Sequence, residues 1–380
     1  MNICLFTPSF LPEVGGMEIV LDKLARCFQE RGHKPVVVAQ RPRHNSELPS
    51  FPYDCIYYPR PRSAVWLLQY VRHVLIREHR KYHFDIIHAH MAYPNGYIAV
   101  KLREKLAVPV IITSHRGDVR LEGRYRQRRI TSKRMCWAME KADAVTAVSS
   151  EVKTIIDNLT ANKANSLVIP NGVDIPPDSA GSMPESCAGI TGKPFMLTLG
   201  RLHPYKGLDL LLKAMRMLCE KEIEMPHLVI AGDGKEMESL RRQTAELQLD
   251  NKVVFTGAVF GDQKHWLLRN CIFFLQPSRT EGMPLTVLEA MAYGKAVIST
   301  RTGGIMELIT NNENGILVEP GDSLSLSEAI MTLRGNPNLE YMQRRARTLA
   351  RQMTWPVIAG RYSELYERLL KQFVFLKKGV

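Results

Sequence analysis

The sequence predicts an α/β fold built from two doubly wound domains, and three features lead to this prediction. The chain has 380 residues, enough for two domains of about 150 residues each. Short runs rich in Val and Ile alternate with helical patterns along both halves, as expected for right-handed βαβ units around a parallel sheet. Residues 170–194 contain five Pro, four Gly and three Ser, which indicates a linker between the halves.

Six short apolar runs in the first half are expected to form buried strands, with a clear helix between the first two. The runs are residues 2–6, 35–39, 85–89, 109–113, 144–148 and 166–169. The helix carries its apolar side chains on one face, namely Val20, Leu21, Leu24, Ala25 and Phe28.

The alternation restarts after the linker. The expected strands are residues 195–199, 228–231, 253–256, 272–276, 296–299 and 315–318, with helices at 208–221 and 235–247 among those between them. A last helical pattern covers residues 354–380, and its periodicity leaves open which domain it joins. We expect domains at 1–172, with 355–380 added, and at 173–354. Ligands of doubly wound folds bind at the carboxyl ends of the strands, so the expected site is a cleft between the domains.

Composition excludes several classes of protein. No uncharged apolar stretch approaches the roughly 20 residues that cross a bilayer, so an integral membrane protein is not expected. The opening residues 1–12 lack a basic leader and predict a strand rather than a signal peptide. The seven cysteines form no Cys-x-x-Cys pair, which argues against a disulfide framework or a structural zinc site and favours the reducing cytoplasm.

The positive charge of the chain is concentrated in its first half. Of a net +13, residues 1–175 contribute +10, from 26 Lys and Arg against 16 Asp and Glu. The more negatively charged partner is therefore expected to meet the first domain.

Gly15 and Gly16 end the loop after the first strand and open the first helix. A helix N-terminus presents unbonded N–H groups, and glycine allows a phosphate to approach closely. Gly16 is thus a candidate phosphate contact, with a plain tight turn as the alternative. The fingerprint Gly-x-Gly-x-x-Gly does not occur, which disfavours a nicotinamide enzyme.

Arg201 and Lys206 lie in residues 200–207, directly after the first expected strand of the second domain. A guanidinium fork and a compact ammonium at the carboxyl end of a strand can hold a diphosphate between them. Two solvated surface charges are the alternative.

Glu281 and Glu289 flank Pro284, which suits the first turn of a helix. At a rise of about 1.5 Å per residue, eight helical positions separate the two acids by about 12 Å. They cannot share one metal ion and are too far apart for the paired carboxylates of a glycosidase. One acid at each end of an extended ligand fits better; a capping Glu and an unrelated surface Glu are the alternative.

His115 follows the strand expected at 109–113, at the end of the sheet where ligands bind. His88 and His90 share one strand face and are a candidate metal pair, but no third ligand has a suggestive spacing. The sequence also contains no Asp-x-Asp element. This element holds a metal ion in enzymes that bind nucleotide diphosphates. An enzyme that handles a nucleotide diphosphate without it would neutralise the phosphates with side chains and helix ends.

Taken together, these segments resemble the retaining glycosyltransferases of the GT-B fold, in particular glycosyltransferase family 4. The resemblance runs from residue 1 to about residue 370. It rests on Gly-Gly-x-Glu at 15–18, Ser-His-Arg-Gly-Asp at 114–118, Pro-Asn-Gly-Val-Asp at 170–174, Gly-Arg-Leu and Lys-Gly within 200–207, Ala-Gly-Asp-Gly at 231–234, Gly257, the Glu281 and Glu289 pair, and Gly303-Gly304. The implied fold is two Rossmann-like domains facing across a cleft.

The resemblance also implies roles for individual residues. Arg201 and Lys206 would grip the donor diphosphate and stabilise the leaving group, while Glu281 and His115 would lie near the transferred sugar as catalytic residues. Glu289 would bind the ribose. Further donor contacts are implied for Gly16, Ala258, Val259, Gly282, Met283, Pro284 and Leu285. Acceptor-side candidates are Glu18, Arg116 and Asp118.

The implied activity is retaining transfer of a hexose or N-acetylhexosamine from a nucleotide-diphosphate sugar. A UDP sugar is favoured, no metal or other cofactor is expected, and the acceptor would be a glycan or lipid-linked saccharide of cell-surface polysaccharide or lipopolysaccharide synthesis. GDP-mannose as donor, and a soluble disaccharide synthase or phosphorylase, are the alternatives. A nucleic-acid-binding protein is disfavoured because no recognition motif accompanies the charge, so no nucleic-acid partner is expected.

The basic first domain suggests an anionic partner. Residues 116–134 contain eight Lys and Arg against two acids, and residues 65–82 combine apolar and basic side chains. The apolar members are Trp66, Leu67, Tyr70, Val71, Val74 and Leu75. This stretch could lie on an anionic membrane at the inner face of the cytoplasmic membrane, or it could be an ordinary helix with a core-facing side.

Overall fold

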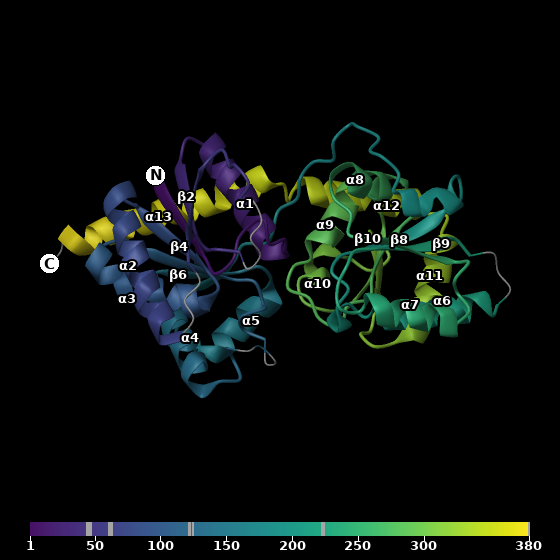
Figure 1. Cartoon of the computed structure of the whole chain (residues 1–380), viewed down its shortest axis with the longest axis horizontal. Helices are drawn as coiled ribbons and strands as arrows, with labels where there is room; N and C mark the ends of the chain where they lie inside the picture. Colours follow the sequence, from purple (N-terminus) through teal and green to yellow (C-terminus); the bar gives the residue numbers. More distant parts are fainter. Residues whose placement is uncertain (43–47, 60–63, 121–122, 124, 222–224, 379–380) are drawn as a thin grey trace. The chain divides into compact units, whose positions relative to one another are not determined.

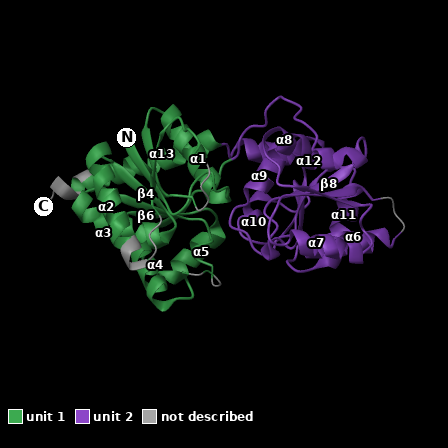
Figure 2. Cartoon of the chain, viewed as in Figure 1, with its two compact units in different colours: residues 1–172, 355–380 green, residues 173–354 purple. Residues whose placement is uncertain are grey.

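The computed structural model describes residues 1–42, 48–59, 64–120, 123, 125–221 and 225–378. The chain forms two compact units (Figure 2). Unit 1 contains residues 1–172 together with 355–380, and unit 2 contains residues 173–354. The chain therefore passes between the units twice, at 172–173 and at 354–355.

Unit 1 is built on a seven-stranded parallel sheet in the order β3-β2-β1-β4-β5-β6-β7 (Figure 1). The strands are β1 (Asn2–Thr7), β2 (Lys34–Gln40), β3 (Asp54–Tyr58), β4 (Ile86–His90), β5 (Val110–Ser114), β6 (Ala144–Ala147) and β7 (Ser166–Val168). β1 pairs with β2 on one side and β4 on the other, so the strand order reverses there. The loops after β1 and β4 consequently diverge at this switch point, where doubly wound folds bind ligands.

Among its described residues, unit 1 also contains six helices and a short turn. They are α1 (Gly16–Glu30), α2 (Ala64–Tyr82), η1 (Ala92–Gly96), α3 (Tyr97–Leu106), α4 (Arg129–Lys141), α5 (Ser150–Leu159) and α13 (Trp355–Lys378). The predicted apolar face of α1 is buried, from Val20 at 3% exposure to Phe28 at 0%.

α13 belongs to unit 1, which settles what its periodicity left open. Its Tyr366 is fully buried, and the phenol oxygen lies 2.6 Å from His88 Nδ1 on β4. The Tyr366 ring also packs on Phe28 of α1, with 5.5 Å between ring centroids. The last helix of the chain therefore closes the core of the first unit.

Two features of unit 1 differ from the sequence predictions. β3 was not predicted; it is a short edge strand in which only Tyr58 is buried, so it lacks the continuous apolar run of the other strands. In α2, Val71, Val74 and Leu75 are buried, so they form a core-facing side and are not available to a membrane. Tyr70 is exposed, and the side chains of Trp66 and Leu67 lie outside those described.

Unit 2 has a six-stranded parallel sheet in the order β10-β9-β8-β11-β12-β13 (Figure 1). The strands are β8 (Phe195–Leu199), β9 (His227–Ala231), β10 (Val253–Gly257), β11 (Phe274–Gln276), β12 (Val297–Thr300) and β13 (Gly315–Val318). The helices are α6 (Leu208–Cys219), α7 (Met237–Glu246), α8 (Gly261–Asn270), α9 (Leu285–Ala292), α10 (Ile305–Leu308), α11 (Ser323–Arg334) and α12 (Leu339–Arg351), with short turns η2 (Glu185–Ile190) and η3 (Pro204–Lys206). All six strands predicted after the linker are present.

The predicted linker is only partly a linker. The chain crosses between units at its start, and η2 near its end has Cys187 and Ile190 buried against unit 2. Its Pro- and Gly-rich composition therefore marks the boundary, but most of the stretch is part of the second unit.

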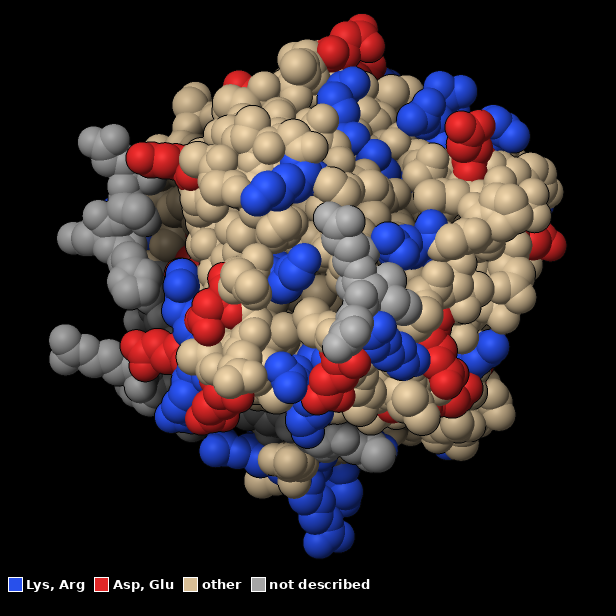
Figure 3. Space-filling view, turned by 90° about the vertical axis from the view of Figure 1, so that its right-hand side faces the viewer, with Lys and Arg blue, Asp and Glu red and all other residues tan. Residues whose placement is uncertain are grey.

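The surface charge of unit 2 is mixed. On the face drawn in Figure 3, Lys and Arg side chains and Asp and Glu side chains are scattered among uncharged residues. This agrees with the small share of the net charge that the second half of the sequence carries.

Candidate functional site

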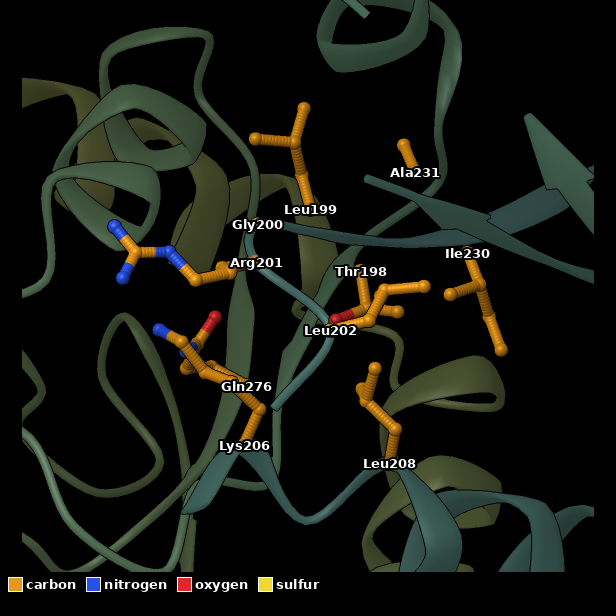
Figure 4. Close-up of a pocket in the computed structure, with 10 residues that line it drawn as sticks. All are labelled: Thr198, Leu199, Gly200, Arg201, Leu202, Lys206, Leu208, Ile230, Ala231 and Gln276. Carbon is orange, nitrogen blue, oxygen red and sulfur yellow. The ribbon is translucent and has the colours of Figure 1, made fainter. Parts of the chain in front are cut away.

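The strand order of unit 2 reverses at β8, which has β9 on one side and β11 on the other. The loops after β8 and β11 therefore leave the sheet side by side at its carboxyl edge. Arg201 and Lys206 both come from the loop after β8, and their side chains extend to the same side of it (Figure 4). The hollow beneath this loop measures only about 10 Å³, so a nucleotide would lie across the loop instead of within it.

Lys206 makes an ion pair with Glu281 from the loop after β11, with 2.7 Å between Nζ and Oε1. The side chains are only 15% and 9% exposed. The same Glu281 oxygen accepts hydrogen bonds from Gln276 Nε2 at 2.8 Å and Ser278 Oγ at 2.6 Å. Three donors thus fix this carboxylate, and through it the ammonium of Lys206.

Arg201 differs from Lys206 in its surroundings. It is exposed, and it forms no ion pair with any residue that the structure describes. The loop therefore offers one cation held by a protein carboxylate and one cation directed to solvent, a few residues apart.

Gly303 and Gly304 hold the loop that carries Glu281. Gly303 has a φ of +53°, and a Cβ there would lie 1.9 Å from the carbonyl oxygen of Glu281. The backbone N–H of Gly304 donates to the Gly282 carbonyl at 2.6 Å. The close backbone approach needs glycine, which gives the Gly-Gly pair of the sequence a physical reason.

The remaining donor-side candidates of unit 2 surround α9 and the loop after β10. Gly282, Met283, Pro284 and Leu285 lead into α9, with Pro284 just before its first residue Leu285. Glu289, one turn further along α9, pairs with Lys264 of α8 at 2.9 Å. Ala258 is exposed and Val259 is 8% exposed in the loop that joins β10 to α8.

In unit 1, His115 follows β5, as the sequence predicts. Its Nε2 lies 2.8 Å from Nδ1 of His90, which ends β4, and the two rings stack with centroids 5.1 Å apart. Burial lowers the pKa of His115 to about 4, so its imidazole is neutral near pH 7. One ring must donate and the other accept, so the tautomers of His90 and His115 are coupled.

The candidate metal pair of His88 and His90 is not supported by its surroundings. His88 Nε2 lies 2.6 Å from Thr113 Oγ1 and its Nδ1 is taken by Tyr366, so both ring nitrogens are occupied. Among the described residues, no group of three or more His, Cys, Asp or Glu is placed to hold a metal ion. His88 therefore serves the core of unit 1.

The acceptor-side candidates are engaged with their own unit. Glu18 is 9% exposed and accepts a hydrogen bond from Ser9 Oγ. Asp118 is 1% exposed and accepts from Ser114 Oγ at 2.7 Å and from the N–H of Ala92 at 3.0 Å. Both carboxylates therefore hold loops of unit 1 in place.

Arg116 and Gly16 lie at the same edge of the sheet as His115. Arg116 pairs with Glu151 of α5 at 2.8 Å. At Gly16, the first residue of α1, a Cβ would meet no atom of the described residues within 4 Å, so there is open space beside its Cα.

The structure adds polar residues that the sequence reasoning missed. Gln276 and Ser278 bind Glu281, and Lys264 pairs with Glu289; no local pattern signals these contacts. Asn95, in η1 after β4, is 1% exposed, and neither its Oδ1 nor its Nδ2 has a hydrogen-bond partner among the described residues. A buried amide without partners marks a place where a polar ligand or water belongs.

Known protein families cover most of the chain. Residues 14–175 match the model of Glycosyltransferase Family 4, and residues 187–352 match that of the glycosyl transferases group 1. Solved structures share the fold over nearly the full length. Sucrose-phosphate synthase from Thermosynechococcus elongatus has a TM-score of 0.82 at 21% identity and covers 98% of this chain and 99% of its own. Anabaena HepE in complex with UDP has a TM-score of 0.79 at 21% identity, covering 97% and 100%.

Two curated relatives have similar sequences. An uncharacterized glycosyltransferase of Methanocaldococcus jannaschii is 29% identical over 75% of this chain and 76% of its own. One of the subunits of the human phosphatidylinositol N-acetylglucosaminyltransferase is 27% identical over 97% of this chain and 76% of its own. The two parallel sheets and these matches define a two-domain, Rossmann-like enzyme of the GT-B architecture. The chain belongs to the family 4-type glycosyltransferases.

Proposed function

We propose that the enzyme transfers a hexose or N-acetylhexosamine from a UDP sugar, with retention and without a metal ion, to a saccharide or lipid-linked acceptor in the synthesis of a cell-surface glycan. The observation that carries this proposal is the pair of cations on one loop at the switch point of unit 2, with Lys206 anchored by Glu281 and Arg201 directed to solvent.

The two cations suit a departing diphosphate. Negative charge grows on the leaving group as the glycosidic bond breaks, and preorganised donors at that place are typically worth about 2.7–4 kcal/mol each. Arg201 offers a fork that matches phosphate oxygens, and Lys206 offers a point charge that is already positioned. The open space beside Gly16 suits a phosphate near the N-terminus of α1. Arg201 and Lys206 would take the role that a divalent ion has in other nucleotide-sugar enzymes.

Glu281 fits the role of a fixed hydrogen-bond acceptor for the donor sugar better than that of a nucleophile. Its Oε1 accepts three hydrogen bonds from protein donors, which hold the carboxylate in place as a hydrogen-bond acceptor. We therefore propose attack by the acceptor on the face from which the diphosphate leaves, with the proton of the acceptor hydroxyl passing to the leaving phosphate oxygen. Glu281 would bind hydroxyls of the donor sugar.

His115 would act as a neutral hydrogen-bonding group beside the sugar. Its depressed pKa keeps the imidazole uncharged, and the contact with His90 leaves Nδ1 as the ring nitrogen open to a ligand. A sugar hydroxyl can donate to this nitrogen or accept from it, according to the tautomer that His115 adopts in its pair with His90.

UDP is favoured by what similar proteins bind. HepE structures contain UDP and UDP-glucose, and the human relative is named for transfer of N-acetylglucosamine. In this chain the ribose would be held by Glu289, after it exchanges Lys264 for the ribose hydroxyls, and the base would lie near Ala258 and Val259.

The surface of unit 1 on α3 and α4 favours an anionic or membrane-bound acceptor. α3 and α4 carry a patch in which Lys101 lies 4.4 Å from the centre of the Trp137 ring and Arg134 lies 5.5 Å from that of Tyr97. Next to it, Ile130 is 66% exposed beside Arg129. An apolar side chain among cations is typical of a surface that meets lipid headgroups. No helix among the described residues is long and apolar enough to cross a membrane.

The donor and the stereochemistry can be tested together. Purified enzyme would be assayed for donor turnover with UDP-glucose, UDP-N-acetylglucosamine, UDP-galactose and GDP-mannose, with and without EDTA. Total membrane lipids or free sugars would serve as acceptors. We expect turnover with a UDP sugar that survives EDTA, a lipid-extractable product and an α-anomer by NMR. A β-anomeric product would contradict retention, and turnover with GDP-mannose alone would contradict a UDP-sugar donor. Loss of activity in EDTA would contradict metal independence. Products formed only from free sugars would favour a soluble disaccharide synthase.

A further inference from the structure

Unit 2 contains a cavity rich in Lys and Arg side chains, away from the donor loop. A cavity of about 340 Å³ is lined by the start of the unit, the end of α8, the end of α9 and α12. α9 and α12 pack side by side (Figure 1). Lys295 of this cavity lies just before β12, and Arg269 lies before β11. The cavity is therefore at the amino edge of the sheet, whereas Arg201 and Lys206 follow a strand at its carboxyl edge.

The cavity is rich in positive charge. Four cations, Arg269, Lys295, Arg347 and Arg351, line it together with two carboxylates, Asp174 and Asp178, which leaves a formal excess of two positive charges. A cluster of this kind is unfavourable by itself, because like charges repel and the surrounding protein screens them less than water does.

Three of these cations are held by backbone carbonyls. Arg269 Nη2 donates to the Pro177 carbonyl at 2.5 Å, Lys295 Nζ to the Arg269 carbonyl at 2.8 Å and Arg347 Nη2 to the Tyr293 carbonyl at 3.1 Å. Within the described part of the chain, no carboxylate forms an ion pair with any of the three. Arg269 Nε is buried and has no hydrogen-bond partner among the described residues.

The cations crowd one another. Burial lowers the pKa of Lys295, and the nearby charges of Arg347 and Arg269 lower it further. The Arg347 guanidinium lies against Gly294, where a Cβ would be 2.7 Å from Nη2, so the missing side chain makes room for it. The geometry thus gathers two guanidinium groups and an ammonium around one space, and no carboxylate of the residues that the structure describes is paired with them.

The cavity also has an apolar wall. Val173, Pro176, Ala292 and Ala350 line it beside the ring of Tyr293. A bare inorganic anion would use only the cations, whereas a small organic molecule would cover the wall as well. The volume is at the lower end of the range for small-molecule sites, about 300–1,000 Å³.

We propose that this cavity binds a phosphomonoester of about the size of a hexose phosphate, with the phosphate among Arg269, Lys295 and Arg347 and the organic part against Tyr293 and Pro176. Guanidinium and ammonium groups recognise phosphate oxygens in this way. The site is independent of the donor loop, so the proposal does not depend on the function proposed above.

The ligand would touch both ends of unit 2. Residues 173–178 follow the first passage of the chain from unit 1, and residues 350–354 precede the second. A phosphate bound there would tie the two segments to the body of unit 2, so occupancy would stabilise the places where the chain leaves it.

Calorimetric titration of the full chain in phosphate-free buffer of low ionic strength tests the proposal. Glucose 6-phosphate, inorganic phosphate and glucose would be titrated with and without saturating UDP. We expect saturable binding of glucose 6-phosphate that UDP does not abolish, binding of inorganic phosphate at least about tenfold weaker, and no binding of glucose. Arg347→Gln and Lys295→Met should each weaken glucose 6-phosphate binding about tenfold, whereas Arg344→Gln, on α12 outside the cavity, should leave it unchanged.

Several results would overturn the proposal. They are the absence of saturable binding, loss of binding in the presence of UDP, and equal affinity in wild type and Arg347→Gln. Equal affinity for inorganic phosphate would overturn the organic part of the ligand. Arg347 is exposed, so Arg347→Gln should keep its fold and give an answer even if the more buried Lys295→Met does not. The melting temperature of each variant without ligand checks this.

Discussion

Removing the ammonium of Lys206 should destabilise the protein, although this residue was predicted from the sequence only as a ligand contact. In Lys206→Met, the carboxylate of Glu281 loses a partner at 2.7 Å while it stays 9% exposed. Breaking a buried ion pair by removing one partner costs about 3–5 kcal/mol. Glu281 keeps its bonds from Gln276 and Ser278, so we expect a loss of about 2–3 kcal/mol in the free energy of unfolding.

A second substitution should separate stability from catalysis. In Lys206→Met with Glu281→Gln, no charge is left unpaired, and the new amide oxygen can still accept from Gln276 and Ser278. We expect this double variant to recover at least half of the lost stability. Turnover of the donor should stay at least about 100-fold below wild type in both variants, because neither restores the cation that faces the leaving group.

Urea unfolding and donor turnover, measured on the same preparations, give the two readouts. Arg345→Met is the matched control, because Arg345 pairs with Glu313 at 3.0 Å with both side chains about half exposed. Removing such a surface cation should cost less than about 1 kcal/mol. Equal unfolding midpoints for wild type and Lys206→Met would refute the reasoning, as would a double variant no more stable than the single one.

Three further predictions concern other parts of the site. His90→Leu removes the hydrogen bond to His115 and should lower kcat roughly tenfold with little change in donor KM. His90→Asn can keep that hydrogen bond and should recover most of kcat. Equal kcat values for wild type and His90→Leu would contradict the positioning role of His90. Because the pKa of His115 falls from 6.5 to about 4 on folding, the unfolded chain binds more protons in that interval, so stability should decrease as pH falls from 6.5 to 4. The pKa values of His88 and His90 are lowered by burial as well, so they contribute to the same slope. His115→Gln should therefore reduce this pH dependence in urea unfolding without removing it, and an unchanged slope would contradict the prediction. Gly303→Ala places a Cβ 1.9 Å from the carbonyl oxygen of Glu281 and should lower the free energy of unfolding by about 2 kcal/mol or more. The control Gly321→Ala has a positive φ but open space around it, and should lower the free energy of unfolding by about 1 kcal/mol. Equal losses for the two variants would refute the close approach at Gly303.

Much of the fold could be predicted from local sequence because parallel strands buried on both faces are continuous apolar runs. The exception was Asp54–Tyr58, an edge strand with one buried residue. The position of Arg201 and Lys206 in the loop after a strand could also be predicted, because the strand and the loop that follows it are both recognised from adjacent residues.

Contacts between distant segments could not be predicted in the same way. Lys206 and Glu281 are 75 residues apart, and no pattern near either one reveals their ion pair. The burial of Asp118 and the bond between His90 and His115 also depend on which loops meet at the edge of the sheet. The sequence shows which residue types reach that edge, whereas the structure shows which of them bind one another.

The apolar stretch of α2 shows why amphipathic patterns are ambiguous. Val71, Val74 and Leu75 have the spacing of either a core-facing or a membrane-facing side, and only their burial in unit 1 distinguishes the two. Ile130 of α4 is exposed next to basic residues, and a single Ile gives no periodic signal that the sequence pattern could reveal.

Calorimetric titration of Arg201→Gln with UDP and with uridine is the most direct test of the claim that two cations on one loop hold the donor diphosphate. Arg201 is exposed and has no ion-pair partner among the described residues, so the variant should unfold like wild type. We predict that UDP binds at least about tenfold more weakly while the affinity for uridine, which has no phosphates, stays the same. Unchanged affinity for UDP would contradict the claim.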